Sequence, residues 1–160
     1  MYGVFLFSTS DIFSQSFWQD LSQTEDEDLG TLAGRMQKTV VASRAPSTVT
    51  SYLRALKRWK PFTDKHQGLC YLPAESSPVA LYLQHILETT RSYHSVDAAC
   101  YALKWAHNIA GIPSPTDHSV VKFVREGAKR ILGRAMLNRK EPLTTEQLNP
   151  LIGKADSNNA

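Results

Sequence analysis

The chain has 160 residues, of which 42% are hydrophobic, and this is enough to fill the core of one domain with short tails. The length therefore excludes a large two-domain enzyme. Two cysteines cannot form a disulfide framework, which excludes a small secreted protein and favours an intracellular location. No apolar run approaches the roughly 18 to 20 residues that a membrane span needs, so we expect no contact with a membrane.

The formal net charge of +3 conceals a division along the chain. Residues 1–34 carry six acids and no Lys or Arg, whereas residues 35–160 carry all 18 Lys and Arg against nine acids, a balance of +9. Clustered cations gain affinity for polyanions by releasing phosphate counterions, so this division favours a nucleic-acid partner. The alternative is that these charges only solvate the surface.

The first 24 residues mix Ser, Gln and Phe without a helical period, so we expect an acidic and poorly ordered leader. From about residue 25 to residue 43, apolar residues recur every three or four positions, and acids occupy the first turn, where the helix dipole favours them. This pattern predicts a first helix. Its apolar positions are Leu29, Leu32, Met36, Val40 and Val41.

Residues 47–65 form the second predicted helix, which Ser47 can cap and which Pro61 should kink or end. At about 100° per residue, its apolar side chains fall within one arc and most of its cations within the opposite arc. The apolar arc holds Val49, Tyr52, Leu53, Leu56 and Trp59, and the cationic arc holds Arg54, Lys57, Arg58 and Lys65. The pattern predicts an amphipathic helix with a cationic outer face.

Three further helices are expected: from Ser77-Pro78, from a Ser95 cap to Gly111, and from an Asp117 cap to about residue 138. Their predicted core positions are Val79, Tyr82, Leu83, Ile86 and Leu87, then Val96, Ala99, Cys100, Leu103, Ala106, His107 and Ala110, then Val120, Val121, Val124, Ala128, Ile131, Leu132 and Ala135. No alternating strand pattern competes with them. We therefore predict an all-α fold, a compact orthogonal bundle of four to five helices over residues 25–138, followed by a basic linker and the capping box Thr144-x-x-Gln147.

Catalysis needs a nucleophile, a base or a metal set in matching geometry, and no convincing set occurs in this sequence. The spacing of His94, Cys100 and His107 places the last two on one helical face, but a structural metal site needs four such ligands. A core thiol and a half-buried imidazole explain them more simply. We expect no cofactor.

The cationic face of the second helix is the strongest functional signal that the residues give. Short polar side chains at its start, Thr48, Thr50 and Ser51, suit contacts with phosphates or base edges in a major groove. Lys104 on the fourth helix and the basic end of the fifth join it. This face predicts binding to double-stranded DNA, with a merely solvated surface as the alternative.

Five linked motifs, in order over about 100 of the 160 residues, resemble the N-terminal core-binding domain of the tyrosine recombinases, the phage-integrase superfamily. They are Ser47-Thr48-x3-Tyr52 with Lys57-Arg58-Trp59; Pro78-x3-Tyr82-Leu83-x2-Ile86-Leu87; Ser95-Val96 with Leu103-x3-His107-x3-Gly111-Ile112-Pro113; Val120-x3-Val124 with Gly127-x2-Arg130; and Lys140-x-Pro142-Leu143-Thr144-x-Glu146-x-Leu148.

The resemblance implies a helical clamp on duplex DNA, with the second and fourth helices facing the groove. The contact residues that it implies, together with the basic end of the fifth helix and the linker, are Thr48, Thr50, Ser51, Arg54, Lys57, Arg58, His94, Tyr101, Lys104, Arg130, Arg134, Arg139 and Lys140. It also implies that the first helix, over 25–43, contacts other protomers on DNA. The location would be nuclear in a eukaryote.

The catalytic motifs of that family are missing from this chain. The family's active site uses arginines, a lysine, a His-x-x-Arg motif and a nucleophilic tyrosine after the linker, and none of the five histidines here is followed by Arg at the third position. Residues 139–160 correspond to the linker and the truncated start of a catalytic domain. We therefore expect no enzymatic strand exchange. A helical protein-interaction module that has lost DNA affinity, and a partial gene model of a complete recombinase, stay open as alternatives.

Overall fold

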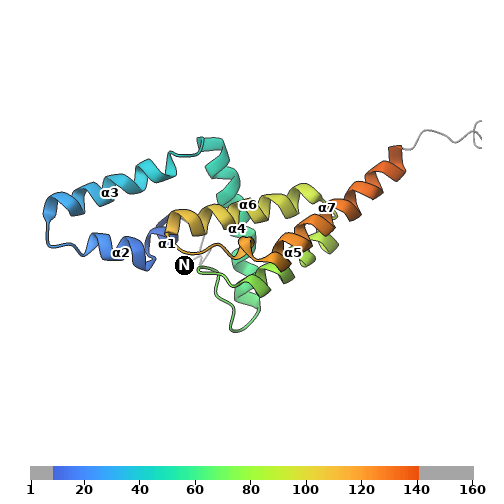
Figure 1. The fold of residues 1–160 in the computed structure, drawn as a ribbon, viewed down its shortest axis with the longest axis horizontal. Helices are drawn as coiled ribbons and strands as arrows, with labels where there is room; N and C mark the ends of the chain where they lie inside the picture. Colours follow the sequence, from blue (N-terminus) through green and yellow to red (C-terminus); the bar gives the residue numbers. More distant parts are fainter. Residues whose placement is uncertain (1–8, 141–160) are drawn as a thin grey trace, which may run out of the picture.

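A computed structural model describes the backbone of residues 9–140 and the side chains up to residue 133. All regular secondary structure in this part of the chain is helical, which confirms the all-α prediction (Figure 1). In chain order the elements are α1 (Thr9–Phe13), α2 (Ser16–Ser22), α3 (Glu27–Val41), α4 (Pro46–Lys65), α5 (Ser76–Thr90), α6 (Tyr93–Ala110), the 3₁₀ turn η1 (Pro115–Asp117) and α7 (Ser119–Lys140).

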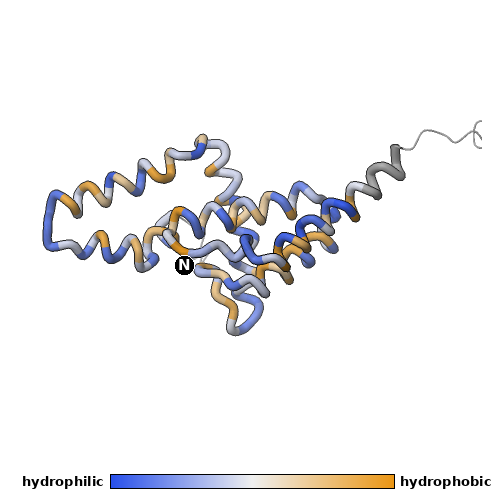
Figure 2. Tube along the Cα trace, viewed as in Figure 1, coloured by the Kyte–Doolittle hydropathy of each residue, from blue (hydrophilic) through white to orange (hydrophobic). Residues whose placement is uncertain are grey.

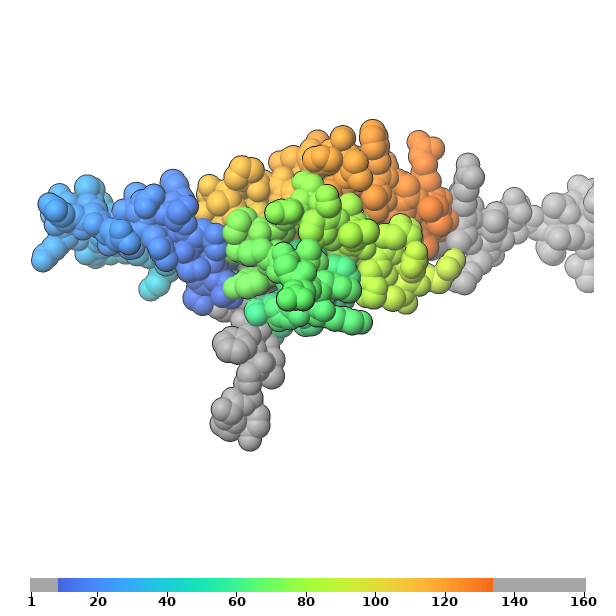
Figure 3. Space-filling model, turned by 90° about the horizontal axis from the view of Figure 1, so that it is seen from below, coloured from blue at the N-terminus to red at the C-terminus, as the bar shows by residue number. Residues whose placement is uncertain are grey.

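Helix α6 organises the core, because it packs against α1, α4, α5, α7 and η1. Every core position predicted for it is buried, and so are all five predicted for α5. Figure 1 shows α4 crossing α6, while α5 and α7 lie together; the space-filling view also places α7 beside α5 (Figure 3). Gly111 ends α6 with a φ of 76°, the left-handed conformation predicted for it.

The N-terminal part of the chain is the main correction to the sequence prediction. The leader was expected to be poorly ordered, but residues 9–22 form α1 and α2, so that expectation is wrong there. Ile12 is 0% exposed and Trp18 is 3% exposed, and the Trp18 indole Nε1 donates a hydrogen bond to the carbonyl oxygen of Ile109 at 2.7 Å. The two short helices thus pack on the C-terminal end of α6. Residues 1–8 lie outside the described part.

Helix α3 confirms the predicted first helix but does not bury its apolar residues. Together with α2 it forms an arm that projects from one end of the molecule (Figure 1), and apolar residues recur along it (Figure 2). The side chains of Leu29, Leu32 and Met36 are 55%, 54% and 39% exposed, and only Ala33 is buried. The periodicity therefore predicted the helix correctly, and its apolar residues are left largely exposed.

Several helix boundaries differ from those predicted. Helix α4 begins at Pro46 without a side-chain cap, so Ser47 lies in its first turn, and the helix passes through Pro61 to Lys65. The buried side chains of Trp59 and Thr63 on either side of Pro61 hold this turn against the core. No side chain caps α5, and Ser92 rather than Ser95 caps α6, by accepting a hydrogen bond from the Ser95 backbone N–H at 3.4 Å.

Helix α7 begins and ends about two residues later than predicted and is less completely buried. Val121, Ala128 and Leu132 are buried as expected, but Val120 and Ile131 are exposed, and Phe123 is 72% exposed. The apolar arc of α7 is therefore wider than the surface that the neighbouring helices cover. The helix extends to Lys140, so residues 139 and 140 belong to it rather than to a linker. The rest of the predicted linker and the capping box at 144–147 lie outside the described residues.

Candidate nucleic-acid interface

The two faces of α4 are separated as its sequence predicts. Leu56 and Trp59 are each 1% exposed, and the Trp59 indole Nε1 donates a hydrogen bond to the carbonyl oxygen of Tyr71 at 2.9 Å. Arg54, Lys57 and Arg58 lie on the exposed side. A helix anchored in this way holds its outer cations on a rigid support.

The three cations are not neutralised by neighbouring acids. Over residues 9–133, no carboxylate lies within ion-pair distance of Arg54, Lys57 or Arg58. The ion pair that α4 does contain, between Lys60 Nζ and Asp64 Oδ2 at 3.5 Å, uses a lysine that is mostly buried. Within the described residues, no internal ion pair thus competes with an external anion for these three cations.

The short polar residues predicted at the start of α4 differ in their accessibility. Thr50 and Ser51 are exposed, whereas Thr48 is half-buried. The Thr50 hydroxyl donates a hydrogen bond to the Pro46 carbonyl oxygen at 2.9 Å, so it is left mainly as an acceptor. Lys65, at the far end of the same helix, is also exposed.

The residues predicted on α6 form a second polar face on the helix against which α4 packs. His94, Tyr101 and Lys104 are all exposed. Lys104 Nζ lies 3.3 Å from Asp117 Oδ1, with both side chains about half exposed, so this charge is partly compensated and the pair adds little stability. The polar face of α6 therefore carries less positive charge than the cationic face of α4.

Arg125 of α7 belongs to this α6 face, and the predicted contact residues did not include it. Its Nε and Nη2 atoms donate hydrogen bonds to Asp97 Oδ1 at 2.8 and 2.6 Å, and Nη2 also donates to the Tyr101 hydroxyl at 3.2 Å. Burial lowers the pKa of Arg125, but the hydrogen bonds to Asp97 and Tyr101 outweigh it and raise the pKa above its usual value. Arg125 also helps to line a cavity of about 220 Å³ with Tyr101, Lys104 and Lys122. No sequence signal pairs residues that lie 28 positions apart.

The remaining predicted contact residues lie on α7. Arg130 is exposed. Arg134, Arg139 and Lys140 belong to the backbone of the same helix, and their side chains lie outside the described part. The structure thus places the predicted residues on three helices, and α4 holds three exposed cations without an ion pair in the described residues.

Of the three residues considered as metal ligands, Cys100 and His107 are buried in the core, whereas His94 is exposed. His107 is fully buried; its Nδ1 lies 2.7 Å from the Leu103 carbonyl oxygen, and its Nε2 accepts a hydrogen bond from the Ala74 backbone N–H at 2.9 Å. Burial lowers the pKa of His107, and burial raises the pKa of Cys100 to about 11. Within the described residues, no three His, Cys, Asp or Glu side chains are grouped to hold a metal ion.

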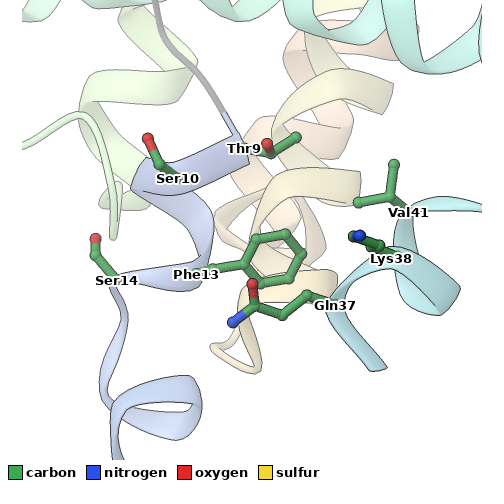
Figure 4. A pocket seen from close by; sticks show the side chains of 7 residues that line it. All are labelled: Thr9, Ser10, Phe13, Ser14, Gln37, Lys38 and Val41. Carbon is green, nitrogen blue, oxygen red and sulfur yellow. The ribbon is translucent and has the colours of Figure 1, made fainter. Parts of the chain in front are cut away.

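A cleft of about 640 Å³ lies between α1 and α3 (Figure 4). Phe13 and Val41 supply its apolar surface, and Lys38 is its one charged lining residue in the described part. The hydroxyls around it include Ser14, whose Oγ donates to the Asp11 carbonyl oxygen at 2.7 Å. No histidine, cysteine or carboxylate is among its described lining residues, and Lys38 is the one titratable group there.

No protein-family model, no curated protein and no solved structure matches this sequence. None of the helices that the structure describes is long and apolar enough to cross a membrane.

Proposed function

We propose that this chain is a DNA-binding module, related to the core-binding domain of the tyrosine recombinases, that contacts duplex DNA through the cationic face of α4. The observation that carries the proposal is the set of three exposed cations, Arg54, Lys57 and Arg58, with no carboxylate beside them in the described residues. The polar face of α6, with His94, lies on an adjoining helix and would extend the contact.

The physical basis of the contact is counterion release. Each phosphate that a cation neutralises frees condensed counterions, so log K falls with log salt by about 0.9 per phosphate. Four contacts would give a slope of roughly −3 to −4. Exposed helical cations lose little by meeting phosphate, because they give up no internal ion pair to do so.

The test is duplex binding by the purified full chain at several salt concentrations, measured by fluorescence anisotropy. The variant R54E/K57E/R58E should lose most of its affinity and make the slope shallower by about 2.7, as expected for three phosphate contacts. A matched control, R35E/K38E on α3, makes the same charge change as the double variant K57E/R58E on α4; the control should keep most of the affinity and K57E/R58E should lose it.

Three outcomes would contradict the α4 surface. A folded R54E/K57E/R58E variant that binds as tightly as the parent would move the contact to another face, with the cations of α7 as the first candidates. A parent chain without salt-dependent affinity at low ionic strength would end the DNA proposal. An unfolded triple variant would show that the face is buried, because exposed charges contribute at most about 1 kcal/mol each to stability.

The second candidate function is a protein-interaction module, and the exposed stripe of Leu29, Leu32 and Met36 on α3 favours it. Exposed apolar patches on a soluble surface commonly mark contacts with other proteins. On DNA, the same stripe would contact a neighbouring protomer. Leu32→Glu should then abolish co-operative assembly on long duplexes and leave the affinity for a single short site unchanged. Sedimentation of the parent and the variant, with and without DNA, distinguishes the two roles.

We also propose that the chain does not cut DNA. A phosphotyrosyl intermediate needs a tyrosine beside clustered cations that stabilise the transition state, and the motifs that supply these groups in the tyrosine recombinases are missing from the sequence. Incubation with nicked suicide substrates should give no covalent adduct. An adduct that disappears with a Tyr→Phe change would overturn this expectation.

A further inference from the structure

A second cleft, of about 520 Å³, lies between the C-terminal half of α4 and α5. Its volume falls within the range of about 300 to 1,000 Å³ that small-ligand pockets occupy. The lining residues that bear on its chemistry are Arg58, Phe62, Lys65, His66, Tyr82 and His85. This cleft is separate from the polar face of α6 and Arg125.

One wall of the cleft is built of aromatic rings in mutual contact. The Phe62 ring lies at the centre, with ring centroids 4.7 Å from His66, 4.9 Å from Tyr82 and 5.5 Å from His85. The rings of Tyr82 and His85 are within 25° of parallel. His66 and His85 are exposed, whereas Phe62 and Tyr82 are more buried and support them. A planar group entering the cleft therefore meets the exposed rings of His66 and His85, which pack on the half-buried ring of Phe62.

The charges around this wall are all of one sign. Arg58 and Lys65 of α4 are its charged lining residues, and no carboxylate is among the described residues that line it. Burial raises the pKa of Tyr82 to about 12, although the positive charge of Arg58 lowers it, so the hydroxyl stays protonated and can donate a hydrogen bond at neutral pH. The cleft thus joins hydrogen-bond donors and cations to a stacking surface.

From this arrangement we infer that the cleft binds a nucleotide unit, with its base against the rings of Phe62 and His85 and its phosphate between Arg58 and Lys65. Stacking on aromatic or histidine rings combined with a cationic groove is the general means by which proteins hold unpaired nucleotides. The bases of an intact duplex are already stacked on each other, so this site goes beyond the proposed duplex surface. It shares Arg58 with that surface but does not rest on duplex binding.

The test compares binding of the full chain to a 12-nucleotide thymidylate strand and to an abasic strand with the same phosphates. Base stacking should make the parent prefer the normal strand by roughly 5- to 150-fold. Phe62→Leu removes the ring but keeps apolar volume, and His85→Ala changes an exposed side chain, so each should reduce this preference strongly. Phe123→Leu and His118→Ala serve as matched controls and should keep the preference for the normal strand. Phe123 is an exposed ring on α7, and His118 is an exposed histidine just before that helix.

Competition with free thymidine monophosphate identifies the source of the nucleotide. Displacement of the strand means that the cleft accepts free nucleotides, and retention of the strand means that it needs a nucleotide within DNA; both outcomes support the site. Equal affinity of the parent for the normal and abasic strands would overturn it. The same conclusion follows if His85→Ala and a folded Phe62→Leu keep the full preference, or if an acidic peptide displaces the strand and the nucleotide does not.

The result for this cleft and the result for the duplex surface can be separated. Loss of the base preference in Phe62→Leu with unchanged duplex affinity would support the cleft alone. A parent chain that binds duplex with the expected salt dependence but shows no base preference would remove the cleft and leave the α4 surface intact.

Discussion

Replacing Ile12 by alanine tests whether the N-terminal helices belong to the cooperative core. The Ile12 side chain is fully buried and is part of the same apolar cluster as Leu103 and Ala110 of α6. Truncating such a side chain costs about 2 to 5 kcal/mol, from lost burial and the cavity left behind. This is a large fraction of the roughly 5 to 15 kcal/mol by which a domain is stable. Helix α1 has five residues and cannot persist without this contact.

The assay is urea unfolding of the full chain followed by circular dichroism. With a denaturant dependence of about 2 kcal/mol per molar, the midpoint of Ile12→Ala should fall by roughly 1 to 2.5 M. The matched control is Leu32→Ala on the exposed side of α3, which should change the free energy of unfolding by less than about 0.5 kcal/mol. If Ile12→Ala unfolds at the same midpoint as the parent, α1 is not part of the cooperative unit.

Two further predictions concern the C-terminal end of α6. Burial lowers the pKa of His107, so below pH about 6.5 the unfolded chain binds a proton at this residue more readily than the folded chain does. As the pH falls from there, the free energy of unfolding should decrease by up to ~1.4 kcal/mol per pH unit until the folded pKa is reached. His107→Gln should show a shallower loss between pH 6.5 and 5 in urea unfolding. Gly111 and Gly68 both have positive φ, so a change of either to alanine should cost about 1–2 kcal/mol in backbone strain. Gly111→Ala should destabilise more than Gly68→Ala, because an added Cβ at Gly111 would lie 2.8 Å from Phe17 Cγ, whereas nothing lies within 4 Å of one at Gly68. Equal melting temperatures for these two glycine variants would refute the clash.

Long helices with a regular apolar period were predictable, because periodicity over about four turns defines one apolar face. Helix α5 shows this clearly, since Val79, Tyr82 and Ile86 are all buried as predicted. Helix α3 shows that the period does not decide whether a neighbouring helix covers that face. Helices α1 and α2 have five and seven residues, too few turns for a period to show. Their order comes from tertiary contacts such as the Trp18 hydrogen bond to Ile109, which no local pattern reveals.

The candidate interface shows the same limit. The arc of Arg54, Lys57 and Arg58 follows from residue spacing alone, because a helix axis fixes the angles between its side chains. The pairing of Arg125 with Asp97 depends on how α7 rotates against α6 and α5, and that rotation is set by packing rather than by the sequence of α7 itself. Spacing therefore predicts faces within a helix and not contacts between helices.

The acids near the N-terminus and the cations of α4 lie in different parts of the structure (Figure 1). The acids at 25–28 lie at the start of α3, where Asp26 caps the helix by accepting a hydrogen bond from the Leu29 backbone N–H at 3.1 Å. Helix α3 has 15 residues and is therefore about 22 Å long, and its acidic start lies at the tip of the arm, away from α4 (Figure 1). This is about twice the Debye length of roughly 10 Å at 0.1 M salt. The acids are thus largely screened from the cations of α4, and a net charge of +3 understates the positive charge that a polyanion at α4 would meet.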